Sequence, residues 1–242
     1  MSKKILILDG SFRKKNTYNL LLQIERILNR KGYETEIINL FDVSINDCIG
    51  CEACVSGTRC GQIDDMSALM KKFMDSDGVV LSSPVYLNSV SSRFKTFADR
   101  TNAWTHKPEP VGKPVMFVTT SAFTGINETR RFFSSFATTF GGRKGDFIAR
   151  IKKNWALPVQ EKELRKFLSL LEKDKKYYKP ANADIIMFTV QKVLSQKADD
   201  DNKKFWVDRQ WLDKSYYYPC KINIFKKLFG KFMYKVISGA MG

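Results

Sequence analysis

The sequence contains no uninterrupted apolar run approaching the roughly 18 residues that a membrane-spanning helix needs. Its N-terminal apolar run covers only residues 5–8, which is too short for the core of a secretory signal peptide. The single histidine, His106, lies in the Pro-containing segment THKPEP, and we interpret it as a surface residue. No catalytic triad is recognisable. These absences predict a cytoplasmic protein whose chemistry does not depend on a conventional acid–base pair.

Two phosphate-binding fingerprints are missing from the loop that follows this first apolar run. Residues 10–17, GSFRKKNT, have neither the Lys-bearing Walker pattern nor the three glycines of the dinucleotide fingerprint. A nucleoside-triphosphate site and a Rossmann NAD site are therefore not expected. No helix-turn-helix, zinc-finger or RNA-binding signature is present either, so nucleic acid is not an expected partner.

Basic side chains are in excess. The 242 residues include 41 Lys and Arg against 25 Asp and Glu, which gives a formal net charge of +16. Residues 151–242 carry 20 of these basic and 10 of these acidic side chains. Such a segment suits an anionic membrane or an acidic protein partner, but a solvated surface is the simpler interpretation. The apolar content of 43% is typical of a globular chain.

Short apolar runs alternate with amphipathic segments through the first 151 residues. This alternation predicts βαβ units, and therefore a parallel sheet with helices on both faces. Ligands of such sheets bind beyond the carboxyl ends of the strands, which nominates the loops at residues 10–17, 82–89 and 119–125. Strands are expected at residues 4–9, 34–40, 78–82, 114–119 and 146–151, and helices at residues 17–30, 64–76, 89–104 and 127–140.

The pattern changes after residue 152. Helices are expected at residues 161–175 and 184–194, followed by an aromatic-rich stretch and a basic amphipathic terminus. We therefore divide the chain into a domain at residues 1–152, with a cysteine-rich insertion at residues 48–60, and a mostly helical extension at residues 153–242.

The terminal segment, residues 221–237, is amphipathic. It contains four lysines after residue 225 and no acidic residue, which is typical of a helix lying in a membrane interface. We favour the alternative, in which the apolar face packs on the core or on a second subunit. That face is formed by Ile222, Phe225, Leu228, Phe229, Phe232, Val236 and Ile237.

Two of the nominated loops carry suitable ligand-binding groups. Ser11, Asn16 and Thr17 offer hydrogen-bond donors beside a helix N-terminus, which suits either a phosphate or a simple helix cap. In the segment SPVYLNS, Pro84 biases Ser83 towards an extended conformation. An extended chain here would leave backbone amides and the Tyr86 ring free to bind a planar heterocycle. The alternative is that the segment is only a strand-to-helix turn.

Four of the five cysteines fall within thirteen residues, with the spacing Cys48-x2-Cys51-x2-Cys54-x5-Cys60. Four thiolates so close together suit a [4Fe–4S] cluster, whereas zinc modules usually present two separated pairs. Gly50 and Gly57 would let the chain wrap closely around a cluster. Free thiols or a redox disulfide are the alternatives, and Cys220 is interpreted as an ordinary cysteine.

Several motifs occur together in a familiar order. Gly10-Ser11-x-Arg13 with Asn16-Thr17 precedes the cysteines, Asp64-Asp65-Met66 follows them, and SPVY precedes Lys95-x-Phe97-x-Asp99-Arg100. Over about residues 3–150 the chain resembles the NAD(P)H-dependent FMN reductase family. More narrowly, it is similar to the iron–sulfur flavoproteins of the flavodoxin-like superfamily. The resemblance implies an α/β fold with a doubly wound, five-stranded parallel sheet, and FMN as cofactor.

The resemblance also implies site residues and partners. The electron donor would be NAD(P)H or a protein, and the chain would form a homodimer or homotetramer. The FMN phosphate would be held by Ser11, Arg13, Asn16 and Thr17, and the ring would be lined by Pro84, Val85, Tyr86, Leu87 and Asn88. The third loop would be formed by Thr119, Thr120, Ser121 and Gly125, and a [4Fe–4S] cluster would be held by Cys48, Cys51, Cys54 and Cys60.

The favoured function is therefore an FMN-dependent oxidoreductase or electron-transfer flavoprotein, with a cluster relaying electrons from the flavin. Without a cluster, a two-electron NAD(P)H reductase acting on FMN or a quinone-type acceptor is expected. A redox sensor based on thiols or metal, with a basic partner-binding tail, is the alternative from another class. No side chain is assigned as an acid–base catalyst.

Overall fold

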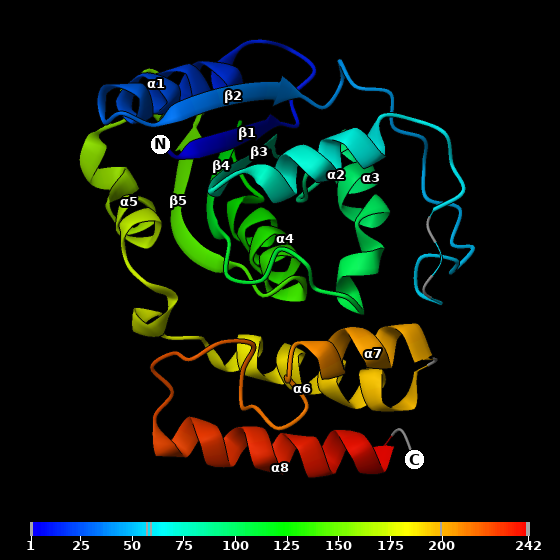
Figure 1. Cartoon of the computed structure of the whole chain (residues 1–242). Coiled ribbons are helices and arrows are strands. Elements are labelled where there is room, and N and C mark those ends of the chain that lie inside the picture. The colour runs from blue at the N-terminus through cyan, green and yellow to red at the C-terminus, as the bar shows by residue number, and fades with distance from the viewer. Residues whose placement is uncertain (1, 57, 59, 199, 241–242) are drawn as a thin grey trace.

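The computed structural model describes residues 2–240 apart from residues 57, 59 and 199. Five parallel strands form one sheet in the order β2-β1-β3-β4-β5 (Figure 1). This is the strand order of doubly wound flavodoxin-like folds, and it confirms the predicted fold class. The strands are β1 (Lys4–Asp9), β2 (Glu34–Asn39), β3 (Gly78–Pro84), β4 (Pro114–Ser121) and β5 (Arg143–Ile151).

Helices cover both faces of the sheet, which explains why its central strands are continuously apolar. Along β1, Leu6 and Leu8 point to one face and Ile5 and Ile7 to the other, and all four are buried. Helices α1 and α5 cover the second face, and α2, α3 and α4 cover the first (Figure 1). Their bounds are α1 (Asn16–Arg30), α2 (Met66–Asp75), α3 (Ser92–Arg100), α4 (Ile126–Thr139) and α5 (Arg165–Glu172).

Two predicted helices are shorter than the periodicity indicated. The helix predicted at residues 89–104 begins at Ser92, because the Ser91 hydroxyl accepts a hydrogen bond from the Phe94 N–H and caps it there. It ends at Arg100 and is followed by a 3₁₀ turn, Asn102–Thr105. The helix predicted at residues 161–175 is a 3₁₀ turn, Glu161–Leu164, followed by α5, which ends at Glu172. The strand predicted at residues 146–151 is longer, because β5 begins at Arg143.

The last third of the chain forms a further helical layer beneath the sheet domain (Figure 1). Its helices are α6 (Asn182–Lys197), α7 (Asp200–Asp208) and α8 (Ile224–Ala240). An aromatic cluster that includes Phe188, Trp206, Trp211 and Tyr217 holds this layer together. Helix α7 was not predicted, because its sequence has too few apolar residues to give a clear period. The division at residue 152 stays a prediction, although Phe167 and Leu171 of α5 already pack into the sheet core.

The apolar face expected on α8 is only partly covered within this chain. Ile222, Phe229 and Ile237 are half-buried, whereas Phe225, Leu228, Phe232 and Val236 remain exposed. Packing of these exposed residues on a second subunit stays a prediction. Small and polar positions contact α6 instead. A Cβ on Gly230 would lie 3.2 Å from a methyl carbon of Ile185, and the Tyr234 hydroxyl donates to Gln196 at 2.8 Å.

Candidate functional site

The three loops nominated from the sequence meet at the carboxyl edge of the sheet. The hydroxyls of Thr17 and Thr120 share a hydrogen bond of 2.7 Å, which joins the start of α1 to the end of β4. The Val85 N–H donates to the Thr120 carbonyl at 2.8 Å, and the Ser91 hydroxyl donates to the Gly10 carbonyl at 2.6 Å. The structure thus brings all three loops into one surface.

Asp9 organises the first loop from beneath. Its buried carboxylate accepts hydrogen bonds from the Ser11 N–H at 3.0 Å, the Ser11 hydroxyl at 2.6 Å and the Asn39 amide at 3.1 Å. Burial raises the pKa of Asp9, and the hydrogen bonds from Ser11 and Ser82 oppose that rise. Ser11 therefore uses its only hydroxyl proton inside the loop, which makes it a positioning residue in this arrangement.

The start of α1 is open to a ligand. Lys15 occupies the N-cap position but makes no side-chain cap, and the N–H groups of Asn16, Thr17 and Tyr18 have no partner in the described chain. Arg13 is exposed and forms no ion pair with any described residue. A helix N-terminus with free N–H groups and an unpaired guanidinium is suited to a phosphate.

The second loop is a tight turn. Tyr86 and Ser89 exchange backbone hydrogen bonds of 2.9 and 3.0 Å, and Leu87 and Asn88 between them have positive φ angles of 45° and 58°. The N–H groups of Leu87 and Asn88 have no partner in the described chain. The Leu87 side chain is 99% exposed and the Tyr86 side chain is half-exposed. The turn therefore presents amide donors next to apolar surface.

The third loop is shorter than predicted, because Thr119, Thr120 and Ser121 belong to β4 and are buried. The Thr119 hydroxyl donates to the Ser83 carbonyl at 2.7 Å, within the sheet. Gly125 has a φ of 84°, and a Cβ there would lie only 2.5 Å from Val85 Cγ1. A side chain at this position would force the second and third loops apart.

Two exposed aromatic residues at this edge were missed. Phe12 in the first loop and Phe123 in the third are 71% and 76% exposed, and the Phe12 ring packs edge-on against Phe41. The sequence does carry a signal for them. Each is a large apolar residue in a candidate ligand-binding loop, and neither fits the hydrophobic periodicity of a helix or a strand. Together with Leu87 and Tyr86 they provide apolar cover for a flat ligand.

The cysteines lie on a long loop between β2 and α2. Cys48, Cys51 and Cys60 are exposed, and Cys54 is half-buried. Burial raises the pKa of the Cys54 thiol, and the neighbouring Cys60 and Cys48 raise it further. Gly50 has the expected positive φ, whereas Gly57 lies outside the described residues.

Arg100 closes the base of this loop. Its guanidinium pairs with the Asp64 carboxylate, with both side chains almost fully buried, and donates to the Asn46 carbonyl at 2.8 Å. It also lies 3.6 Å from the Cys60 sulfur, where a positive charge favours a thiolate. At the other end, the Asn202 amide of α7 donates to the Val55 carbonyl at 2.5 Å. The loop is thus anchored by both the sheet domain and the C-terminal helices.

The described residues contain no group of three or more His, Cys, Asp or Glu side chains placed to hold a metal ion. The donor set still suits an iron–sulfur cluster, because four thiols lie on one loop and a buried cation adjoins one of them. The unpaired amides and exposed aromatic residues at the sheet edge suit a phosphate-bearing flat ligand.

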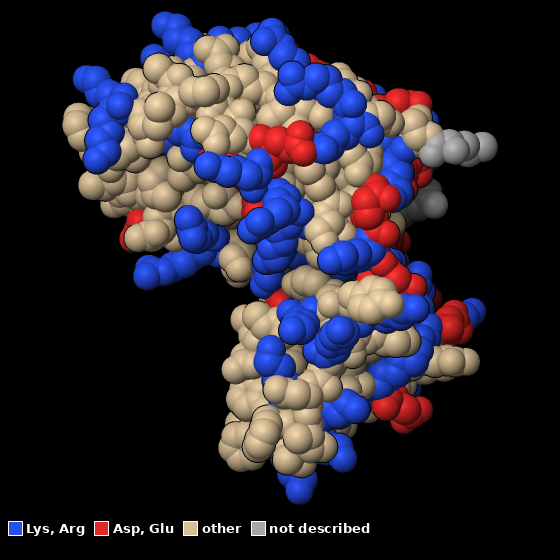
Figure 2. Space-filling model, turned by 90° about the vertical axis from the view of Figure 1, so that its left-hand side faces the viewer, with Lys and Arg blue, Asp and Glu red and all other residues tan. Residues whose placement is uncertain are grey.

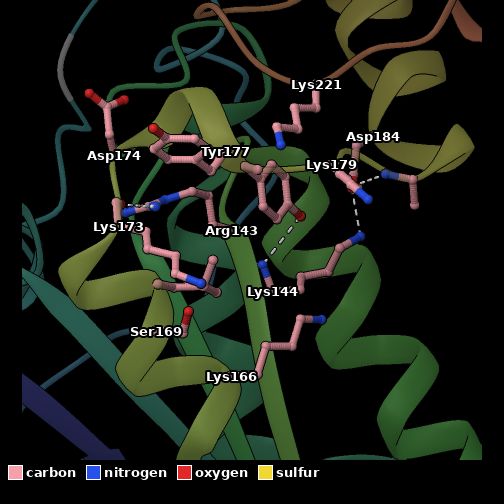
Figure 3. A pocket seen from close by; sticks show the side chains of 13 residues that line it. Arg143, Lys144, Lys166, Ser169, Lys173, Asp174, Tyr177, Lys179, Asp184 and Lys221 are labelled. Carbon is pink, nitrogen blue, oxygen red and sulfur yellow. Dashed lines mark hydrogen bonds and ion pairs between the residues drawn. The ribbon is translucent and has the colours of Figure 1, made fainter.

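A cavity of about 670 Å³ lies elsewhere, beside the amino end of β5 (Figure 3). It is lined from β5, from α5 and the segment after it, from the first turn of α6, and from the segment before α8. None of the side chains assigned to the cofactor lines it.

A family model for NADPH-dependent FMN reductases matches residues 3–142. The chain is 39% identical over 98 residues to an iron–sulfur flavoprotein of Methanocaldococcus jannaschii, a match that covers 40% of this chain and 51% of the relative. It is 38% identical over 97 residues to an iron–sulfur flavoprotein of Archaeoglobus fulgidus, covering 40% and 48% of the two chains. The chain thus spans about half the length of these curated relatives.

Solved structures show the same fold at low sequence identity. RosB, in a complex with 8-demethyl-8-formylriboflavin-5'-phosphate, matches with a TM-score of 0.56 at 13% identity and 92% coverage of both chains. An NADH:FMN oxidoreductase matches with a TM-score of 0.52 at 15% identity, covering 71% of this chain and 87% of the other. The coverage by RosB extends the likeness in fold beyond β5 into the C-terminal helices.

Proposed function

The chain belongs to the NADPH-dependent FMN reductase family, and we propose that it is an FMN-dependent oxidoreductase that takes electrons from NAD(P)H. The observation that carries this proposal is the joining of the three loops through Thr17, Thr120 and Val85. A free helix N-terminus and an amide-rich apolar turn lie on the surface so formed. FMN has a phosphate at one end and a flat ring at the other, so it matches both parts.

The phosphate is assigned to the start of α1. Arg13 and Asn16 supply side-chain donors, and the unpartnered N–H groups of the first turn supply backbone donors. Thr17 can also give its hydroxyl proton to the phosphate when Thr120 is the donor in their shared hydrogen bond. Ser11 contributes through its bonds to Asp9, which fix the path of the loop. Charge-assisted hydrogen bonds from a guanidinium are the strongest of these contacts.

The ring is assigned to the turn formed by residues 84–88. Tyr86 and Leu87 supply apolar surface, and the N–H groups of Leu87 and Asn88 supply donors for the polar edge of the ring. Phe12 and Phe123 flank this turn and would exclude water from the ring. Thr119 supports the turn from β4 through its bond to the Ser83 carbonyl, and Ser121 fixes the third loop by donating to the Thr124 carbonyl. Gly125 allows the third loop to approach the turn.

When bound, FMN supplies the redox chemistry, because it accepts a hydride and releases electrons singly or in pairs. The chain binds and orients the flavin and keeps one face open to a nicotinamide donor. Donors near the polar edge of the ring stabilise negative charge there. This division of labour explains why the site needs no acid–base side chain.

We further propose that Cys48, Cys51, Cys54 and Cys60 hold a [4Fe–4S] cluster. Their spacing, the contact between Arg100 and Cys60, and the names of the relatives support this assignment. A cluster at this position would relay single electrons between the flavin and an external carrier. A homodimer or homotetramer, as the resemblance implies, would cover the exposed Leu87 and Phe123; sedimentation velocity tests this directly.

Anaerobic reduction of the FMN-loaded protein tests the function. Addition of NADPH or NADH should bleach the flavin absorbance at a rate that saturates with donor concentration. The variant Arg13→Gln should weaken FMN binding about tenfold, the value of one charge-assisted hydrogen bond. Arg165→Gln, which also removes an exposed arginine, is the matched control. Failure of both nucleotides to reduce bound flavin would contradict the proposed donor.

A further inference from the structure

The outer face of α8 carries large apolar side chains that the described chain leaves largely exposed. Leu228, Phe232 and Val236 follow Ile224 at intervals of four residues, and with Phe225 they form one row that is 47–77% exposed. The opposite face of α8 packs on α6, and α8 is the outermost helix of this layer (Figure 1). The exposed row therefore lies on the side of α8 away from α6. Soluble proteins rarely expose a contiguous apolar row of this kind without a partner for it.

The charges beside the row are mostly positive. Lys227, Lys231 and Lys235 are exposed along one edge of it, Asp213 lines the same groove as these lysines, and no Asp or Glu occurs in the sequence after Asp213. In Figure 2, blue basic side chains are spread over the lower lobe of the molecule, with fewer red acidic ones among them. The surface that covers the row should therefore be apolar in its interior and negatively charged at its edge.

A second copy of the chain fits these charges poorly. In a two-fold symmetric contact through α8, the same patch meets itself, so lysines would face lysines with no acidic residue of the tail between them. Spanning a membrane is not the role either, since no helix in the described chain is both long and apolar enough. A surface of anionic lipid satisfies both requirements.

We propose that α8 lies flat on a membrane surface that contains anionic lipid. The row Ile224, Phe225, Leu228, Phe232 and Val236 enters the boundary between headgroups and acyl chains, and Lys227, Lys231 and Lys235 contact the headgroups. The flavin site lies on the sheet domain, so membrane binding and flavin binding are separate properties.

Cosedimentation of the full chain with vesicles tests this. Vesicles of phosphatidylcholine with 30% phosphatidylglycerol (roughly the anionic content of a charged membrane surface) are compared with phosphatidylcholine alone. The double variant Leu228→Ser with Phe232→Ser should abolish binding, and Leu157→Ser, another exposed leucine, should not. Replacing Lys227, Lys231 and Lys235 by Gln should weaken binding about fivefold per lysine. The charge-matched control replaces Lys152, Lys153 and Lys162 by Gln, which removes three positive charges outside α8.

Three results would overturn the proposal. The first is a wild-type chain that does not bind anionic vesicles, and the second is binding that survives the Leu228→Ser, Phe232→Ser change. The third is a dimer in sedimentation velocity that this double variant converts to monomer, which would assign the row to a second copy. Circular dichroism of each variant confirms that the exposed substitutions leave the fold intact.

A different observation concerns the cavity in Figure 3. The Arg143 side chain is 5% exposed, and it donates to the carbonyls of Gly112 and Lys173 at 2.7 and 3.1 Å. No carboxylate of the described residues pairs with it. Burial lowers the pKa of Arg143, and the charge of nearby Asp174 only partly opposes this effect. Burial also lowers the pKa of Lys175, and the positive charge of Arg143 lowers it further. Keeping a cation buried without a directly bonded carboxylate is costly, so an anion in the cavity would stabilise Arg143.

The rim of the cavity strengthens this excess of positive charge. Lys166, Lys173, Lys179 and Lys221 line it, and none forms an ion pair with another described residue. The two acidic side chains of the lining are outnumbered by these lysines, and only Asp184 forms an ion pair among the described residues. Asp184 pairs with Lys144 at 2.6 Å, and the Asp174 carboxylate accepts from the Lys176 N–H at 2.8 Å.

We infer that this cavity binds a small phosphorylated anion. Its volume of about 670 Å³ is that of a small-molecule site, and Lys166 and Lys221 approach it from opposite sides (Figure 3). Because Arg143 is at the amino end of β5, the site is separate from the carboxyl edge assigned to FMN.

Isothermal titration with inorganic pyrophosphate tests the second proposal. Lys166→Gln with Lys179→Gln should weaken binding at least about tenfold, since each lysine can give a charge-assisted hydrogen bond. Lys152→Gln with Lys153→Gln is the charge-matched control, and Arg13→Gln reports on binding at the flavin loop instead. Absence of binding, equal loss in the control, or loss only in Arg13→Gln would each overturn the inference.

Discussion

The ion pair between Arg100 and Asp64 should be the main clamp on the cysteine loop. We expect Arg100→Met to destabilise the protein, because Asp64 would remain buried without its cation. Only 3% and 1% of these two side chains are exposed. Removing one partner of a buried pair typically costs about 3–5 kcal/mol. The backbone N–H groups of Asn46 and Met66 still donate to Asp64, so the lower value, about 3 kcal/mol, is expected.

The effect should depend on pH in a defined direction. Burial alone would raise the pKa of Asp64, but the hydrogen bonds from Arg100, Asn46 and Met66 outweigh it and hold the pKa below its usual value. Because the pKa of Asp64 is lower in the folded state, its ionisation stabilises the fold at pH values above the unfolded pKa of about 3.9. This stabilisation is lost as the pH falls through the folded pKa. The difference between wild type and Arg100→Met should therefore be largest near pH 7 and shrink below about pH 4.

Thermal and urea unfolding at pH 7, 5, 4 and 3 measure this difference. For a chain of this size, a loss of about 3 kcal/mol corresponds to a fall of roughly 6–12 °C in Tm. The control is Lys95→Met on the same helix, since Lys95 and Asp99 form an exposed pair that contributes at most about 0.5 kcal/mol. Equal losses in the two variants, or a loss in Arg100→Met that does not change with pH, would refute the reasoning.

Three further changes have defined outcomes. Gly125→Ala should weaken FMN binding at least tenfold, because the added Cβ would lie 2.5 Å from Val85 Cγ1 and the φ of 84° disfavours a side chain. The control is Gly61→Ala, whose Cβ would meet nothing within 4 Å and which should bind FMN normally. Cys54→Ser should reduce iron bound under anaerobic conditions, whereas Cys220→Ser should not, and equal iron in both would contradict the cluster assignment. Burial lowers the pKa of Lys113 to about 8, so stability should rise between about pH 8 and 10.4, where only the unfolded state holds the proton. Urea unfolding should show a smaller rise for Lys113→Met; an unchanged rise would exclude Lys113 as its source.

The fold was predictable because its signals are local and repeated. Buried parallel strands need continuous apolar runs, and residues 4–9, 78–82 and 114–119 supply them between amphipathic helices. The ends of elements were less predictable, since they depend on single side-chain contacts. The Ser91 cap at the start of α3 is one example.

The candidate site was predictable as a set of loops but not in its internal contacts. The sequence places Ser11 and Thr119 near the carboxyl edge, yet only the structure shows their hydroxyls bonded to Asp9 and Ser83. Likewise, an apolar helix face indicates a partner without saying whether the same chain supplies it. Packing of the α8 row on a second subunit therefore stays a prediction, whereas the core of this chain leaves Leu228, Phe232 and Val236 exposed.

The central claim is that this chain binds FMN at the carboxyl edge of its sheet and an iron–sulfur cluster at its four clustered cysteines. Anaerobic purification followed by a visible spectrum, with FMN, iron and sulfide measured on the same sample, tests it most directly. We expect flavin bands with about one FMN and about four irons per chain, the number for a four-cysteine cubane. A colourless protein that contains neither and fails to bind added FMN would contradict it.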